Sequence, residues 1–238
     1  MKQNVTRRGF LGAAGAVAAA GAVTGAVQAA EEKPQAPVKS IKILAIGCSP
    51  KAVSSTAASL QVCLDAAKAV APEHIEVELI LLAGLRINGN VAAGVPLEPG
   101  ERDDFPALVP KLTDPAVAGI IIGSPVYFGN MSSLCKAFLE RLMTCRTDGL
   151  TLSNKVGGVL AVGGARNGGQ ELTIKSIQTV LFSQEMIVVG ETRPTAHFGP
   201  GVWNSKSFGE VTKDEVGMTA VKALGRRVAE VARLVTKA

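Results

Sequence analysis

The fold of this chain is decided by one stretch, Ala118-Gly119-Ile120-Ile121-Ile122-Gly123-Ser124-Pro125-Val126-Tyr127-Phe128-Gly129-Asn130-Met131-Ser132. Its first five residues form a short apolar run that predicts a buried strand over residues 119–123. The ten residues that follow hold two glycines, a proline and two aromatic rings, and they predict an irregular loop that leads into a helix. In an open α/β sheet, ligands bind beside the loops at the carboxyl ends of parallel strands. An ordinary strand-to-helix turn explains the same residues, so the choice between a ligand-binding loop and a simple turn depends on the neighbouring loops.

Strands and helices alternate along the rest of the chain. The expected strands cover residues 41–47, 77–82, 119–123, 156–162 and 187–189, and the expected helices cover residues 56–70, 104–112, 132–144, 171–184 and 213–236. This alternation predicts a parallel sheet with helices on both faces, which is a three-layer α/β sandwich. Right-handed crossovers then favour the flavodoxin-like strand order 2-1-3-4-5. Two longer segments, 83–102 and 191–211, are expected to be irregular.

The composition is that of a folded domain with a large core. Hydrophobic residues make up 47% of the 238 residues and aromatic residues only 4%, which favours helices packed on a sheet. The formal net charge is +5, but Lys2, Arg7 and Arg8 lie in a segment that we expect to be removed and that holds no acid, which leaves +2. So small a charge, with no basic stripe interleaved with aromatic residues, argues against nucleic acid as a partner.

The amino terminus has the pattern of an export signal. Two arginines, Arg7 and Arg8, are followed by Gly9-Phe10-Leu11 and by an uncharged run rich in Ala, Gly and Val that reaches Ala30. This pattern resembles the twin-arginine signal of bacteria. The alternative is a retained membrane anchor, because the run is close to the ~20 residues that span a bilayer, although Ala and Gly insert weakly.

The signal sets the expected domain organisation. We expect residues 1–29 to be a twin-arginine signal peptide, residues 30–40 a linker with two prolines, and residues 41–238 a flavodoxin-like FMN-binding domain. The expected location is the periplasm, or another site reached by the twin-arginine export machinery. Because that route carries proteins already folded, often with a cofactor inserted, a tightly held cofactor is expected.

The cysteines and histidines do not form a metal motif. Cys48, Cys63, Cys135 and Cys145 show no C-x-x-C spacing, and the two histidines are far apart in the sequence. We expect the four thiols to be buried as small hydrophobic groups. No metal site is predicted.

The loop after the first strand is rich in hydroxyls and precedes a helix. Ser49, Lys51, Ser54, Ser55 and Thr56 supply hydrogen-bond donors where a helix amino terminus also favours an anion, so a phosphate dianion would fit. The loop is neither G-x-x-x-x-G-K-[ST] nor G-x-G-x-x-G, which disfavours ATP and a dinucleotide bound in the Rossmann manner. The alternative is ordinary capping of the helix by Ser or Thr.

If the strands have the order 2-1-3-4-5, the loops after the third and fourth strands meet the first loop at the same edge of the sheet. In the second loop, Tyr127 and Phe128 offer apolar surface and Asn130 offers polar groups; the glycines of the third loop, residues 163–170, let a backbone approach a flat ring. A phosphate at one end and a polar-edged ring at the other indicate a mononucleotide-sized ligand, for which FMN is the natural candidate. No nucleophile or metal cluster is needed, because the flavin carries the chemistry. No catalytic side chain is therefore assigned.

These motifs resemble a known family. Residues 123–139 resemble the flavin-ring loop of NAD(P)H-dependent FMN reductases and iron–sulfur flavoproteins, and residues 168–174 resemble a motif of the quinone reductases named after tryptophan-repressor binding. Gly47-Cys48-Ser49-Pro50-Lys51 is similar to their phosphate loop. The resemblance implies that phosphate is held by Ser49, Lys51, Ser54, Ser55 and Thr56. It implies that the isoalloxazine is framed by Pro125, Val126, Tyr127, Phe128, Gly129, Asn130, Gly163, Gly164, Ala165, Arg166 and Gly168.

The resemblance also implies partners and shows departures. It implies NAD(P)H as a co-substrate and a homodimer or homotetramer. Iron–sulfur flavoproteins carry a compact cysteine motif after the second strand, whereas residues 83–104 of this chain hold no Cys, so a cluster is not expected. Since NAD(P)H is found in the cytoplasm, an exported member of the family is expected to use a different electron donor.

Three functions are open at this stage. The first is an FMN-dependent oxidoreductase that passes hydride or electrons to a small-molecule acceptor such as a quinone or free flavin. The second is a periplasmic electron carrier with a protein redox partner, although carriers usually have a strongly acidic docking face. The third is a module that has lost flavin. Two readings are open for His197 and Trp203: they cover the flavin or the acceptor, or they pack at a surface or an interface. Two are also open for Arg166: it steadies a flavin carbonyl or an anionic substrate, or it is a solvated loop residue.

Overall fold

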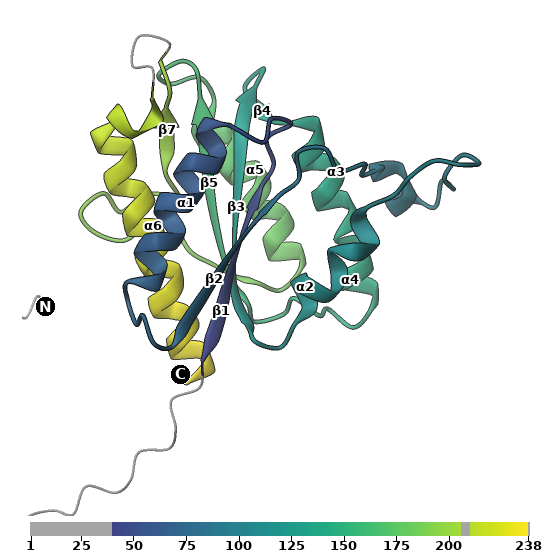
Figure 1. The fold of residues 1–238 in the computed structure, drawn as a ribbon, viewed down its shortest axis with the longest axis horizontal. Coiled ribbons are helices and arrows are strands. Elements are labelled where there is room, and N and C mark those ends of the chain that lie inside the picture. The colour runs from purple at the N-terminus through teal and green to yellow at the C-terminus, as the bar shows by residue number, and fades with distance from the viewer. Residues whose placement is uncertain (1–39, 206–209, 238) are drawn as a thin grey trace, which may run out of the picture. The chain divides into compact units, whose positions relative to one another are not determined.

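The sheet has the predicted strand order. A computed structural model describes residues 40–205 and 210–237, so the predicted signal peptide and the linker up to residue 39 lie outside the described residues. The parallel strands follow the order β2 (Ile75–Leu81), β1 (Ile41–Gly47), β3 (Val117–Tyr127), β5 (Val156–Gly163) and β6 (Ile187–Val188) (Figure 1). The order 2-1-3-4-5 is therefore confirmed.

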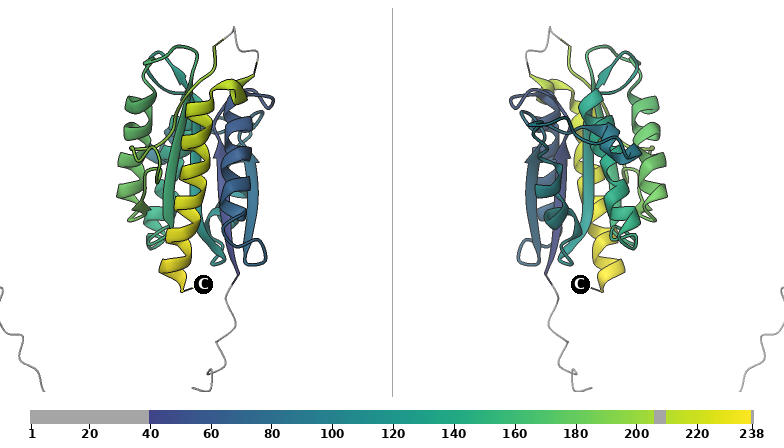
Figure 2. Two further views of the ribbon diagram at one scale, coloured as in Figure 1. Left: turned by 90° about the vertical axis from the view of Figure 1, so that its left-hand side faces the viewer. Right: turned by 90° about the vertical axis from the view of Figure 1, so that its right-hand side faces the viewer.

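Helices cover both faces of this sheet, as the two edge-on views in Figure 2 show. One face carries α1 (Ser55–Lys68) and α6 (Glu215–Thr236); the other carries α2 (Val109–Thr113), α3 (Ser133–Arg141), α4 (Met143–Thr147) and α5 (Gln170–Ser183). Among the described residues, none of the helices combines the length and the apolarity needed to cross a bilayer.

The core consists of two apolar layers, one on each side of the sheet. Successive side chains of a strand point to opposite faces, so Ile43 of β1 packs toward α1 and α6 while Leu44 packs toward α3 and α5. Helices α1 and α6 pack closely at Gly225, where any side chain would collide with the backbone of Cys63. The two layers hold the strand ends, and hence the loops that follow them, in fixed positions.

Strand β3 is longer than predicted. The expected loop at 124–127 continues the strand to Tyr127, which pairs with Asn130 of the antiparallel β4 (Asn130–Met131). The two residues between them have φ of 50° at Phe128 and 81° at Gly129, as a two-residue hairpin turn of this type requires. The prediction of an irregular loop was wrong because a Phe stands where such turns usually carry Asn or Asp.

The segment after β6 is less irregular than predicted. It contains β7 (Gly201–Trp203), which pairs in parallel with the carboxyl-terminal half of β5. Three residues flanked by Gly and Pro give no strand signal in a sequence. The predicted helix over 132–144 is divided at Leu142 into α3 and α4, and that over 104–112 into a 3₁₀ turn, η2 (Phe105–Ala107), and α2.

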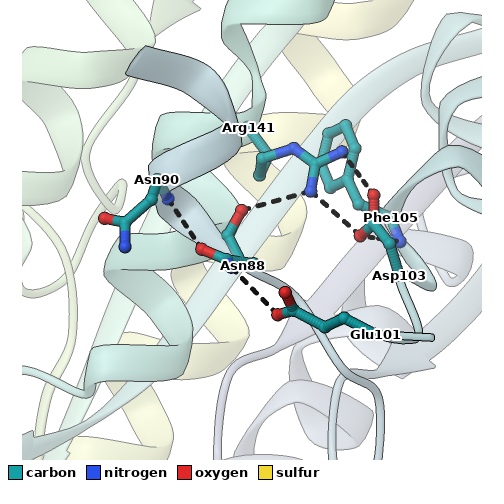
Figure 3. A network of polar contacts seen from close by, with 6 residues as sticks. All are labelled: Asn88, Asn90, Glu101, Asp103, Phe105 and Arg141. Carbon is teal, nitrogen blue, oxygen red and sulfur yellow. Dashed lines mark hydrogen bonds and ion pairs between the residues drawn. The ribbon is translucent and has the colours of Figure 1, made fainter. Parts of the chain in front are cut away.

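The long segment between β2 and η2 is anchored by a buried ion pair. Arg141 of α3 donates two hydrogen bonds to Asp103, at 2.9 and 2.8 Å, and a third to the carbonyl of Asn88 at 3.2 Å (Figure 3). Asn88 in turn bonds Glu101 and caps the 3₁₀ turn η1 (Gly89–Ala93). The guanidinium also lies 4.7 Å from the ring centroid of Phe105. The segment is thus held at its base by one arginine.

Candidate functional site

A cleft opens where strands β1, β3 and β5 end. Its volume is about 650 Å³, within the roughly 300–1,000 Å³ of small-molecule sites. All three loops singled out in the sequence contribute to it. We call this site the cleft; its lining is Ser49, Lys51, Val53, Ser54, Ser55, Thr56, Ala58, Pro125, Val126, Tyr127, Val162, Gly163, Gly164, Asn204, Glu210, Val211 and Thr212.

One end of the cleft is the amino terminus of α1. Ser54 caps this helix, its Oγ accepting the N–H of Ala57 at 3.1 Å. Ser55 and Thr56 are the first two residues of α1, and their N–H groups have no acceptor within the helix. Lys51 is exposed at the mouth, and Asn204 donates to the Oγ of Ser55. These donors and the helix dipole make this end suited to an anion.

The other end of the cleft is apolar and built from backbone. Pro125 and Val126 of β3 form one wall with Tyr127, which is 44% exposed. On the neighbouring strand, Gly163 ends β5 and Gly164 follows it, and a side chain at Gly164 would meet no atom within 4 Å. An open backbone beside an apolar wall can accept the face and edge of a flat ring.

Two contacts hold the three loops together. Ser132 Oγ donates to the carbonyl of Cys48 at 2.7 Å, which ties the segment after the hairpin to the end of β1. At Gly169, where φ is 107°, a Cβ would lie 2.7 Å from the Cα of Gly129, so the third loop packs directly on the hairpin turn. The cleft is therefore a composite site whose shape depends on both contacts.

Ten of the sixteen predicted site residues line the cleft: Ser49, Lys51, Ser54, Ser55, Thr56, Pro125, Val126, Tyr127, Gly163 and Gly164. The other six do not line it in this structure: Phe128, Gly129, Asn130, Ala165, Arg166 and Gly168. Phe128, at the hairpin tip, is fully exposed. Their assignment to a flavin ring stays a prediction.

Arg166 instead lies over the ring of Trp203, with its guanidinium carbon 4.4 Å from the ring centroid. Arg166, Trp203 and His197 line a second cavity, which we call the edge cavity because it lies beside β7 at the edge of the sheet. Neither Trp203 nor His197 lines the cleft. The structure therefore places both side chains in the edge cavity and not in the predicted flavin site.

Sequence reasoning missed the part of the cleft that comes from the carboxyl-terminal third of the chain. Asn204 follows β7, and Glu210, Val211 and Thr212 precede α6. No local motif marks these residues. Recognising β7 as a strand paired with β5 would have placed Asn204 beside the third loop, because Asn204 N–H donates to the carbonyl of Gly163 at 2.9 Å.

The cysteine beside the cleft is not suited to be a nucleophile. Cys48 is fully buried at the end of β1, and burial, together with the neighbouring Cys135 thiol, raises its pKa well above the ordinary range. Its Sγ contacts the carbonyl of Ile46 at 3.8 Å. A thiol held neutral is a poor nucleophile, so Cys48 is assigned a packing role.

The fold and the cleft together define a class: flavodoxin-like α/β proteins with a mononucleotide-sized site at the ends of the parallel strands. Residues 41–200 match the NADPH-dependent FMN reductase family, and the chain belongs to this family of NAD(P)H-dependent quinone and FMN reductase-type oxidoreductases.

Individual relatives agree with this assignment. The chain is 38% identical over 200 residues to an iron–sulfur flavoprotein of Methanocaldococcus jannaschii, a match that covers 83% of this chain and 100% of that protein. It is 35% identical over 127 residues to an NAD(P)H dehydrogenase (quinone) of Acidithiobacillus ferrooxidans, covering 48% of this chain and 62% of that protein. The crystal structure of RosB with a bound 8-demethyl-8-formylriboflavin-5′-phosphate has the same fold, with a TM-score of 0.66, 15% identity and coverage of 83% and 81%.

The iron–sulfur cluster in the name of the Methanocaldococcus jannaschii relative does not fit this chain. Cluster binding needs about four thiolates that converge on one point. The chain has four cysteines, but Cys63 packs on the α1–α6 side of the sheet, whereas Cys48, Cys135 and Cys145 pack on the opposite side. Within the described residues, no three or more His, Cys, Asp or Glu side chains form a group that could hold a metal ion.

Proposed function

We propose that this chain is an exported FMN-dependent oxidoreductase that passes hydride or electrons to a quinone, a flavin or a similar small acceptor. The observation that carries the proposal is the composition of the cleft, which has anion-binding donors at one end and an apolar, backbone-lined wall at the other. FMN has a phosphate and a flat ring in the same arrangement. The family supplies the reaction class and NAD(P)H as the candidate donor.

The residues present fit FMN. The first-turn N–H groups of α1, with Ser55 and Thr56, would hold the phosphate, and Lys51 would add a cation at the mouth. Pro125–Tyr127 and Gly163–Gly164 would hold the ring and keep water from one of its sides. Bound FMN would supply hydride or electron transfer, which needs no protein nucleophile.

Export is part of the proposal and rests on the amino-terminal sequence. The paired Arg7 and Arg8, followed by an uncharged run, support the twin-arginine route, which exports folded, cofactor-loaded proteins. Replacing both arginines by Lys should keep the protein in the cytoplasm. Normal appearance of the double variant in the periplasm would contradict the proposal.

The visible spectrum of the purified full-length protein tests FMN binding. We expect a yellow protein with flavin absorption, or uptake of one FMN per chain when FMN is titrated into colourless protein. A protein that is colourless and takes up no FMN would overturn the proposal. Steady-state assays with NADH or NADPH and a soluble quinone then separate an enzyme from an electron carrier, because only an enzyme turns over with small substrates alone.

A further inference from the structure

Asn204 connects the two ends of the cleft, although it is distant from both in the sequence. It follows β7 and lines the cleft. Its backbone N–H donates to the carbonyl of Gly163 at 2.9 Å, and its side-chain amide donates to Ser55 Oγ at the amino terminus of α1. Asn204 and Ser55 are 149 residues apart in the chain. One residue thus bonds both the glycine-rich loop and the hydroxyl-rich loop of the cleft.

The backbone around Asn204 is held without help from its side chain. Strand β7 pairs in parallel with β5 as far as Trp203, and Trp203 N–H donates to the Asp214 carboxylate at 2.8 Å. The bond from Asn204 to Gly163 uses the backbone N–H, which every residue except Pro supplies. Replacing the side chain should therefore remove the contact with Ser55 and leave β7 in place.

The contact from Asn204 determines which role the Ser55 hydroxyl can take. A serine hydroxyl donates one hydrogen bond and accepts others. The amide of Asn204 fills an acceptor position of Ser55 Oγ, and within the described residues Ser55 Oγ donates to no protein group. The O–H of Ser55 is thus available to an anion in the cleft.

Two other hydroxyls of this loop are arranged in the same way. Ser49 Oγ and Ser54 Oγ each accept a backbone N–H of their own loop, at 3.1 Å in both cases. Ser55 obtains the corresponding donor from the side chain of Asn204. The acceptor positions of these hydroxyls are occupied by N–H groups, which leaves their O–H groups as donors toward the cleft.

A neutral amide suits position 204 better than a carboxylate would. Glu210 lines the same cleft, and its exposed carboxylate accepts the hydroxyl of Thr212. A second carboxylate, at position 204, would itself accept the O–H of Ser55 and would repel a phosphate. The amide of Asn204 supplies a donor to Ser55 without adding charge.

We propose that Asn204 is a positioning residue for the flavin phosphate. Its amide fills an acceptor position of the Ser55 hydroxyl, so that the O–H of Ser55 donates to the phosphate. This inference rests on the proposed function, because it takes FMN as the ligand of the cleft. It predicts that the preference for FMN over riboflavin, which lacks the phosphate, depends on Asn204 and that this dependence acts through Ser55.

A double-mutant cycle tests the proposal on the full-length protein, with FMN and riboflavin titrations followed by flavin fluorescence. Asn204→Ala should weaken FMN about 10-fold and riboflavin less than about 2-fold, because the contact serves the phosphate alone. Ser55→Ala should weaken FMN at least as much. The double variant should bind FMN no more than about 2-fold more weakly than Ser55→Ala, because Asn204 has then lost the group through which it acts.

A residue that only supported the loop would give a different result. The losses of the two single variants would then multiply in the double variant, or FMN and riboflavin would be weakened alike. Either result, or unchanged FMN affinity in Asn204→Ala, would overturn the proposal while FMN binding by the wild-type protein leaves the proposed function intact. If the wild-type protein takes up no FMN, the proposed function fails and this proposal fails with it.

A matched control and a second variant complete the test. Gln178 of α5 also donates through its side-chain amide to a distant segment, the carbonyl of Phe198 at 2.6 Å, and it does not line the cleft. Gln178→Ala should change both affinities less than about 2-fold. If Asn204→Ala does not fold, Asn204→Asp keeps the size of the side chain and should weaken FMN at least ~10-fold and riboflavin less than about 2-fold. Unchanged FMN affinity in Asn204→Asp would overturn the proposal.

Discussion

The cleft and the edge cavity lie on two sides of one glycine-rich loop, residues 163–170, and they have opposite chemistry. Gly163 and Gly164 face the cleft, whereas Arg166 and Gly169 face the edge cavity. Apart from Glu210, the polar groups of the cleft are hydroxyls, an amide, a lysine and a helix amino terminus, which together favour an anion. The edge cavity gathers carboxylates and aromatic rings, which favour a cation.

The difference shows how little backbone is needed to separate two electrostatic environments. The amino terminus of α6 borders the edge cavity and would by itself favour an anion, as that of α1 does. Asp214 caps α6 through Gly217 N–H in the same way that Ser54 caps α1 through Ala57 N–H, but the Asp side chain brings a carboxylate to the helix end whereas the Ser side chain brings a neutral hydroxyl. The choice of an Asp or a Ser as the helix cap thus contributes to the opposite character of the two sites.

The largest expected effect comes from a third region, the Arg141–Asp103 ion pair, which lines neither the cleft nor the edge cavity and should affect only the stability of the fold. Arg141→Leu should lower the free energy of unfolding by about 3–5 kcal/mol, because it leaves a buried carboxylate unpaired. Urea unfolding followed by circular dichroism measures this. Lys136→Met, which removes an exposed ion pair with Glu140 on the same helix, should cost less than about 1 kcal/mol. Similar costs for the two variants would refute the structural role of Arg141.

The same pair predicts a dependence on pH. The hydrogen bonds from Arg141 lower the pKa of the Asp103 carboxyl below its ordinary value. Its contribution to stability is therefore complete above the unfolded-state pKa of about 3.9 and is lost as the pH falls through the lower, folded-state pKa. Asp103→Asn should flatten this acid limb of a plot of urea midpoint against pH. An acid limb of unchanged slope would show that other carboxylates cause it.

The next largest effect should follow from removing the anion-binding end of the cleft. The triple variant Ser54→Ala, Ser55→Ala and Thr56→Ala should weaken FMN about 100-fold, since it removes hydroxyl donors and the cap of α1. It should weaken riboflavin, which lacks the phosphate, much less. Flavin fluorescence titration measures both. Replacing Ser176, Thr179 and Ser183 of α5 by Ala removes three hydroxyls that bond only their own helix and should leave both affinities unchanged. Equal losses for FMN and riboflavin would contradict the phosphate assignment.

An intermediate effect should come from the loop that separates the two sites. Gly169→Ala places a Cβ against the backbone of Gly129 at a positive φ, so the loop has to shift. We expect about a 10-fold loss of FMN affinity and a destabilisation of about 1–3 kcal/mol. Gly164→Ala is the matched control for stability, because a side chain there meets nothing within 4 Å. If both variants are equally stable, the packing of the loop on the hairpin does not shape the cleft.

The smallest effect should come from Lys51, whose side chain is exposed at the mouth of the cleft. Lys51→Gln should weaken FMN only about 2- to 5-fold at low ionic strength, and the difference should shrink as salt screens the charge. A salt-independent loss would mean that Lys51 acts by packing instead of by charge.

The sequence predicted the parts of the cleft that depend on local patterns. Apolar runs of strand length gave the five parallel strands, and turn residues after the first, third and fourth of them gave the three loops. Nine of the ten predicted residues that line the cleft lie within two residues of a strand end or of the start of α1, and the tenth, Lys51, lies in the loop between β1 and α1. The rule that carboxyl ends of neighbouring parallel strands meet at one edge was enough to bring them together.

The sequence alone thus determined the strand order, the two-sided packing and the anion-binding end of the cleft, because each depends on periodicity or on residue types within one loop. Only the tertiary structure decided that β7 joins the edge of β5, that Asn204 reaches Ser55, and that Arg166 stacks on Trp203 outside the cleft. These contacts join segments distant in the chain, and no local preference specifies them. The edge cavity has the same origin: its carboxylates come from α5, the N-cap of α6 and the segment between β6 and β7, and they meet only when the sheet edge is complete.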